Sequence, residues 1–123
     1  MFVAMGHGVE ERAHVGKLDA LTAAHVAETM QALSTASRVR ILGRLRESPC
    51  AVAELAAAVE MEQSAVSHQL RLLRHLRLVV GERRGRQIVY ALHDSHVADL
   101  LDEAVFHVEH VRLGFSEPIE SAS

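Results

Sequence analysis

Residues 63–90 read QSAVSHQLRLLRHLRLVVGERRGRQIVY, and the spacing of their apolar side chains changes halfway along. In the first half the spacing is helical, with Val66, Leu70 and Leu73 on one face. In the second half β-branched and aromatic residues flank the segment GERRGR, which predicts two short strands joined by a turn over residues 81–86. A helix with one polar face followed by a basic hairpin is typical of the second half of a winged helix-turn-helix.

Apolar side chains at helical spacing predict further helices on both sides of this stretch. The helices are expected at about 18–33, 37–46, 52–59, 63–76 and 95–113. Pro49 ends the second helix because proline cannot continue one, and Gly114 follows the last. The expected fold class is therefore α+β and mainly α, a winged helix-turn-helix with a C-terminal dimerisation helix.

The basic residues gather in the middle of the chain, although the net charge is −3. Between Ser37 and Tyr90 there are ten Arg against five Glu, whereas the rest of the chain carries the remaining three basic and eleven acidic residues. A basic middle with acidic ends is typical of a module that binds a polyanion. An ordinary solvated surface is the alternative, and the position of the arginines in the winged helix-turn-helix favours nucleic acid.

Two groups of polar side chains are the candidates for contacts with DNA. The helix over 63–76 offers short or planar hydrogen-bonding groups suited to base edges and phosphates in a major groove. The hairpin tip offers guanidinium groups to the neighbouring backbone or minor groove. The candidates are Gln63, Ser64, Ser67, His68, Gln69, Arg71, Arg83, Arg84 and Arg86. Either group alone is also typical of a solvated surface, whereas the ordered set predicts a DNA-binding domain.

Length and composition predict one folded domain. A chain of 123 residues with 49% apolar and 24% charged residues has room for a single core and is not typical of a disordered protein. We expect a flexible N-terminal tail over 1–17, a DNA-binding and dimerisation domain over 18–113, and a C-terminal tail over 114–123. The absence of a long apolar run, of a secretory signal and of a second cysteine beside Cys50 predicts a cytoplasmic protein with no membrane partner.

A second set of residues has the spacing of metal ligands on the last expected helix. Asp94 and His96 stand at its start, and His107 and His110 follow towards its end. His96 and His107 are eleven residues apart, which separates them by about 16 Å along one helix, whereas a metal–nitrogen bond is about 2 Å long. One chain therefore cannot close the site, and two copies packed antiparallel would form two equivalent sites. The alternatives are a helix N-cap for Asp94 and a polar edge without metal for the histidines.

Three segments resemble the ArsR/SmtB family of bacterial repressors. They read ASRVRIL at 36–42, QSAVSHQLRLL at 63–73 and GRQIVY at 85–90. The resemblance implies a homodimer that binds an inverted repeat of double-stranded operator DNA and releases it when an inducer binds. Asp-x-His, ten residues, then His-x-x-His is similar to the C-terminal-helix metal site of this family. The family's thiolate site needs Cys-Val-Cys where this chain has Ala51-Val52-Ala53.

The donor set leaves more than one metal open. Imidazole and carboxylate ligands suit zinc, cobalt and nickel, and four of them complete a tetrahedral zinc site. Nickel and cobalt more often take six ligands, and a chain that starts at Met5 and loses it would offer the amine of Gly6 and the imidazole of His7. This start resembles those of the family's nickel and cobalt sensors. We expect Ni(II) or Co(II), with Zn(II) as the alternative, and the alternative for His7 is a tail histidine that binds nothing.

The expected function is a metal-responsive transcriptional repressor that binds operator DNA as a homodimer and is released when Ni(II) or Co(II) binds. A zinc-responsive repressor of the same fold and a metal-independent DNA-binding regulator are the alternatives. We expect no enzyme and no small-molecule substrate, because a catalytic metal site keeps an open position, a cleft and a general base, and none is apparent in the sequence.

Overall fold

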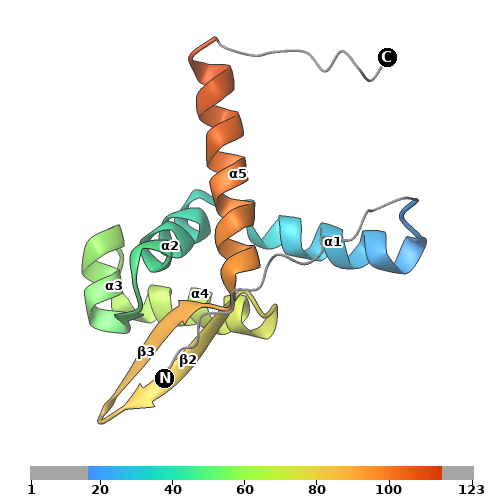
Figure 1. The fold of residues 1–123 in the computed structure, drawn as a ribbon. Coiled ribbons are helices and arrows are strands. Elements are labelled where there is room, and N and C mark those ends of the chain that lie inside the picture. Colours follow the sequence, from blue (N-terminus) through green and yellow to red (C-terminus); the bar gives the residue numbers. More distant parts are fainter. Residues whose placement is uncertain (1–16, 115–123) are drawn as a thin grey trace.

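The fold is a winged helix-turn-helix with one further helix at each end, as Figure 1 shows for the computed structural model. The structure describes residues 17–114, so the expected tails over 1–17 and 114–123 lie outside the described residues apart from Lys17 and Gly114. The elements are α1 (Ala20–Ala32), α2 (Ala36–Glu47), β1 (Cys50–Ala51), α3 (Val52–Val59), α4 (Gln63–His75), β2 (Val79–Arg84), β3 (Gln87–Leu92) and α5 (Ser95–Arg112). The expected fold class is confirmed.

Local signals place the helix ends. Oγ1 of Thr35 accepts a hydrogen bond from the backbone N–H of Arg38 at 3.3 Å and so caps the start of α2. Oδ1 of Asp94 accepts hydrogen bonds from the backbone N–H groups of His96 at 2.9 Å and Val97 at 3.2 Å, so Asp94 is the N-cap of α5. All the expected helices are present, and none of their ends differs from the expected position by more than two residues.

The core lies mainly between α2, α3 and α4, where the apolar faces of these helices meet. Its most deeply buried large side chains are Ile41, Leu42, Leu55, Leu70 and Leu73. Burial of each such side chain contributes about 1.5–3 kcal/mol. Because the apolar face of α4 is committed to this core, its polar face is turned outward.

The hairpin is longer and its turn tighter than the sequence predicts. β2 and β3 pair in antiparallel register as far as Arg84 and Gln87, so only Gly85 and Arg86 form the turn. Gly85 has a φ of +66°, which glycine adopts without strain at the first position of a two-residue hairpin turn. The expected six-residue turn is therefore wrong. Strand pairing continues through a polar segment that has no alternating apolar signal.

The sequence pattern did not predict a third strand. The residues of β1, Cys50 and Ala51, pair with Tyr90 and Val89, and the strand order in the sheet is β1-β3-β2. Two residues are too few to show an alternating pattern, so only the long-range pairing reveals this strand. The pairing ties the end of α2 to the hairpin, and the side chain of Cys50 is buried in the core.

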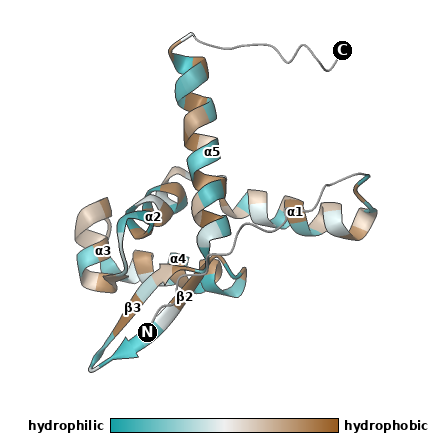
Figure 2. Ribbon diagram, viewed as in Figure 1, coloured by the Kyte–Doolittle hydropathy of each residue, from teal (hydrophilic) through white to brown (hydrophobic). Residues whose placement is uncertain are grey.

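α1 and α5 extend away from this core (Figure 1), and hydrophobic residues recur along both helices (Figure 2). Several of their large apolar side chains are exposed. On α1 only Ala32 is buried, and Val26 and Met30 are 41% and 48% exposed. On α5 only Val97 and Leu101 are buried. The large apolar side chains that stay exposed on α5 are Val105, Phe106, Val108 and Val111. No helix between residues 17 and 114 is long and apolar enough to cross a membrane.

Candidate nucleic-acid interface and metal ligands

The outer face of α4 carries most of the helix residues that the sequence predicts to contact DNA. The inner face is buried in the core, and the side chains between the buried positions are exposed or half-buried. The candidates on this outer face are Gln63, Ser64, Ser67, His68 and Arg71. Their short or planar hydrogen-bonding groups are of the kind that reads base edges, and contact with DNA stays a prediction.

Gln69 is a helix candidate that already has a partner inside the protein. Its side chain is half-buried, and its Oε1 accepts a hydrogen bond from Nε of Arg38 on α2 at 2.9 Å. Its carbonyl oxygen is therefore used at least once inside the protein, and its contact with DNA stays a prediction. Helical spacing alone does not distinguish a polar residue at the edge of the buried face from one at the centre of the exposed face.

An open hollow joins α4 to the hairpin. A cavity of about 390 Å³ is lined by Gln63 and Ser67 on one side and by Arg86 and Tyr90 on the other. A second cavity, of about 530 Å³, continues along α4. Its lining residues are Ser67, Arg71, Arg74, His75 and Tyr90. Ser67 and Tyr90 line both cavities, so the helix and the hairpin share one basic surface.

Arg74 and Tyr90 are lining residues that the sequence pattern did not predict. Arg74 follows Arg71 by three residues, and this spacing could have placed it on the same helix face. The strand pattern identifies Tyr90 only as a sheet residue. The structure lays the Tyr90 ring against Gly81, where an added Cβ would lie 3.0 Å from the ring atom Cε1. Glycine at this position therefore leaves the ring room beside the hollow.

The arginines of the hairpin gather at its turn. Arg86 belongs to the turn, and Arg83 and Arg84 are the last two residues of β2 directly before it, so all three lie at the tip end of the hairpin, where the sequence predicts them. Their contact with DNA stays a prediction. All three are exposed, and Arg84 donates a hydrogen bond to Oε1 of Glu82 at 3.1 Å. An exposed ion pair of this kind contributes at most about 1 kcal/mol, so it does not prevent contact with a phosphate.

The predicted metal ligands do not come together within one chain. Asp94 and His96 lie at the start of α5, and His107 and His110 lie towards its other end. Within residues 17–114 no group of three or more His, Cys, Asp or Glu side chains is arranged to hold a metal ion. His110 is half-buried, and its ring centroid lies 5.2 Å from that of Phe106. A site built from all four residues would need a second copy of the helix.

Asp94 is oriented by its neighbours. Its Oδ1 caps α5, and its Oδ2 lies 3.1 Å from Nδ1 of His93. Burial acts to raise the pKa of Asp94, but hydrogen bonds from His93 and from two backbone N–H groups outweigh burial and hold this pKa below its usual value. The carboxylate is thus kept in the anionic form that a metal ligand needs. His93 was not a sequence candidate, although it adjoins Asp94, and the candidates Gly6 and His7 lie outside the described residues.

Known proteins are similar to this chain in sequence and in fold. The family described as Bacterial regulatory protein, arsR family, matches residues 35–80. The chain is 60% identical over 119 residues to the HTH-type transcriptional regulator NmtR of Mycobacterium tuberculosis, covering 96% of this chain and 99% of that protein. The solution structure of apo-NmtR superposes with a TM-score of 0.68 at 59% identity, covering 96% of this chain and 100% of the other. A homodimeric winged helix-turn-helix DNA-binding domain from Mycobacterium bovis superposes with a TM-score of 0.72 at 28% identity, covering 85% and 100%.

Proposed function

Since the chain belongs to the ArsR family of bacterial regulatory proteins, we propose that it is a metal-responsive transcriptional repressor that binds operator DNA as a homodimer. The observation that carries the proposal is the shared surface of α4 and the hairpin, with its arginines and short polar side chains. The repressor acts in the cytoplasm, where operator DNA is found. Its relatives are named as transcriptional regulators, and neither enzyme activity nor a small-molecule substrate is part of the proposal.

α4 is the recognition helix in this proposal, with Ser67 and His68 directed at base edges in the major groove. Arg83, Arg84 and Arg86 contact phosphates or the neighbouring minor groove. Phosphate contacts hold the protein in register, and base contacts supply the sequence preference. Two copies related by a twofold axis would place their recognition helices about 34 Å apart, one turn of the DNA duplex, on an inverted repeat.

The outward apolar faces of α1 and α5 support the homodimer. Large apolar side chains on two adjoining helices are of the kind that a partner subunit covers. A shallow apolar groove between α5 and the start of α2 is lined by Leu33, Val39, Leu101, Val105 and Val108, among others, and could accept side chains of a second copy. The homodimeric state of the Mycobacterium bovis domain, which has a similar fold, is consistent with this arrangement.

The donor set of α5 fits a divalent ion. One carboxylate and three imidazoles are ligands that nickel, cobalt and zinc accept, and no thiolate is needed. Two antiparallel copies of α5 would bring Asp94 and His96 of one chain beside His107 and His110 of the other. Oδ1 and Oδ2 of Asp94 each already accept hydrogen bonds, but a carboxylate has about four acceptor positions and can still bind an ion.

Ni(II) or Co(II) is the proposed inducer, with the amine of Gly6 and the imidazole of His7 completing a six-ligand shell. Zinc needs only the four ligands of α5, so it is the alternative inducer, and a regulator that ignores metals is the second alternative. An ion that drives release binds the DNA-free conformation more tightly than the DNA-bound one. A coupling of about 1–3 kcal/mol is typical and corresponds to roughly a 5- to 150-fold loss of operator affinity.

The test is a titration of operator binding with Ni(II), Co(II) and Zn(II), performed on chains that begin at Met1 and at Gly6. The duplex probe is one selected by the metal-free protein from a random-sequence pool. Weaker binding with nickel or cobalt, and a larger response from the chain that begins at Gly6, is the expected result. Equal responses of both chains would remove the N-terminal residues from the mechanism. A larger response to zinc would make the protein a zinc sensor, and no response would leave a metal-independent regulator.

A further inference from the structure

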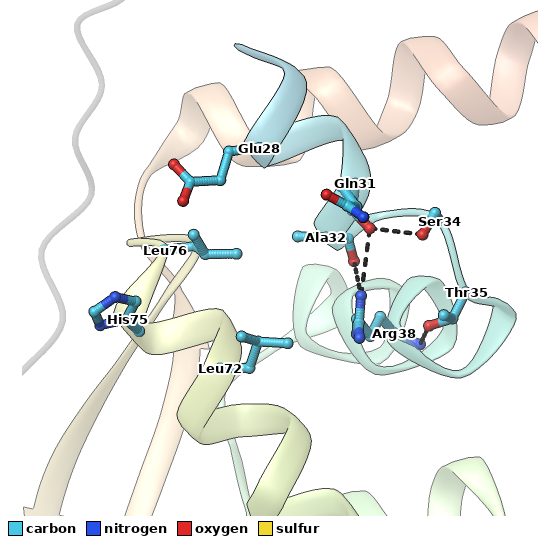
Figure 3. Close-up of a pocket in the computed structure, with 9 residues that line it drawn as sticks. All are labelled: Glu28, Gln31, Ala32, Ser34, Thr35, Arg38, Leu72, His75 and Leu76. Carbon is cyan, nitrogen blue, oxygen red and sulfur yellow. Dashed lines mark hydrogen bonds between the residues drawn. The ribbon is translucent and has the colours of Figure 1, made fainter. Parts of the chain in front are cut away.

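One guanidinium group joins three helices of the DNA-binding half. Nε of Arg38, on α2, donates a hydrogen bond to Oε1 of Gln69 on the recognition helix at 2.9 Å. Its Nη1 donates to the backbone carbonyls of Gln31 and Ala32 in the last turn of α1, each at 3.3 Å. Figure 3 shows the contacts with α1, in which the Arg38 side chain points towards the end of that helix. Arg38 is half-buried, so these bonds are partly shielded from water.

Arg38 is one of several donors at the end of α1, because the carbonyl of Gln31 also accepts from the backbone N–H of Ser34 at 3.0 Å and from its hydroxyl at 2.7 Å. The last carbonyls of a helix have no partner within the helix, and basic side chains commonly satisfy them. α1 has no basic residue in its own last turn. Arg38 therefore acts as a C-terminal cap delivered from the next helix. Arginine suits this role because its rigid fork of N–H donors reaches two directions at once, whereas lysine offers a single ammonium group.

An open hollow separates part of α1 from the recognition helix, although Ala32 in the last turn of α1 is buried in the core. A cavity of about 340 Å³ lies between the ends of α1 and α4, lined by Glu28 on one side and by Leu72, His75 and Leu76 on the other (Figure 3). Arg38 lies at its border. Beside the packing of Ala32, the polar contacts that bridge the two helices across this hollow then contribute to their relative direction.

We propose that Arg38 is a positioning residue for operator recognition, which holds α4 against the end of α1 through Gln69. This inference rests on the proposed function, because it assigns to α4 the reading of the operator. Gln69 is then the internal partner of Arg38 and not a reader of bases. Because α1 also exposes apolar side chains suited to a second subunit, the same contact relates the position of α4 to the subunit interface.

The experiment compares Arg38→Lys, Gln69→Glu and Gln69→Leu with the wild type and with Arg40→Lys as the matched control. Arg40 lies on the same helix and is exposed, and its Nη2 lies 3.9 Å from Oε1 of Glu60. Arg38→Lys and Arg40→Lys keep the positive charge, and Gln69→Glu keeps the hydrogen-bond acceptor. Gln69→Leu removes the acceptor. Affinity is measured for a duplex selected by the wild type from a random pool and for a scrambled duplex, and thermal unfolding is followed in parallel.

A positioning role predicts that Arg38→Lys and Gln69→Leu lose about 10-fold in affinity for the selected duplex. Their affinity for the scrambled duplex should stay at the wild-type level. The control Arg40→Lys should bind both duplexes as the wild type does. Gln69→Glu should retain most of the discrimination, because a carboxylate still accepts the bond from Arg38. The inference is overturned if Arg38→Lys discriminates as the wild type does, or if it loses affinity for both duplexes equally because the fold has weakened. If Gln69→Glu lost as much affinity for the selected duplex as Gln69→Leu does, Gln69 would be assigned to direct contact with DNA. Failure of the wild type to select any sequence would refute the proposed function itself.

Discussion

Two variants that each lack one histidine of α5 should restore half of the metal capacity when they are combined in one dimer. The variants are His96→Ala and His107→Ala. If each site takes Asp94 and His96 from one chain and His107 and His110 from the other, a heterodimer of the two variants carries both lesions in one site. Its other site keeps all four ligands.

The expected factor of one half comes from the length of α5. The eleven residues between His96 and His107 span about 16 Å at 1.5 Å per residue, which is several times the reach of two metal–nitrogen bonds of about 2 Å each. Within residues 17–114 no single chain assembles three or more ligands. An intrachain site would instead be lost from both chains of the heterodimer. The intersubunit geometry therefore predicts half of the wild-type capacity, and the intrachain geometry predicts none.

The assay is a metal count at saturating Co(II) by equilibrium dialysis on heterodimers isolated through two different affinity tags. A homodimer of each variant is the control and should bind no cobalt at these sites. Heterodimers that bind no cobalt would refute the intersubunit geometry. Full wild-type capacity would show that neither His96 nor His107 is a necessary ligand.

Three further predictions follow from the hairpin and from the ion pair between α2 and α5. Arg86→Ala should weaken binding to all DNA sequences and reduce by about one the slope of log affinity against log salt concentration; an unchanged slope would remove this arginine from the phosphate contacts. Gly81→Ala should lower operator affinity, because the new Cβ lies 3.0 Å from the facing tyrosine ring, whereas Gly43→Ala, with no atom within 4 Å, should leave affinity unchanged in the same binding assay. The hydrogen bond from Arg46 holds the pKa of Asp102 below its usual value, so its stabilisation is present above pH about 4 and is lost as pH falls further. Denaturant midpoints of wild type and Asp102→Asn should therefore differ at neutral pH and converge in acid; a difference that persists in acid would contradict this.

Signals that act within a few residues of the chain were enough to predict the helices and the face of α4. Side chains such as Asp94 cap the helix that immediately follows them, and the buried face of a helix repeats every three or four residues. These signals do not depend on how distant segments meet. For this reason the helix ends, the N-cap of α5 and the outward position of Ser67 and His68 could be read from the linear pattern.

Features that depend on distant segments could not be read in this way. The pairing of Cys50 with Tyr90 forms β1, although two residues carry no pattern of their own. Arg38 donates a hydrogen bond to Gln69, 31 residues away, and so gives Gln69 a partner inside the protein. The polarity of Gln69 had predicted contact with DNA. In both cases the chain between the partners must first fold back, and the cost of ordering it is repaid only when the surrounding contacts form together. The tertiary arrangement thus separates polar side chains that are internal partners from those that remain open to DNA.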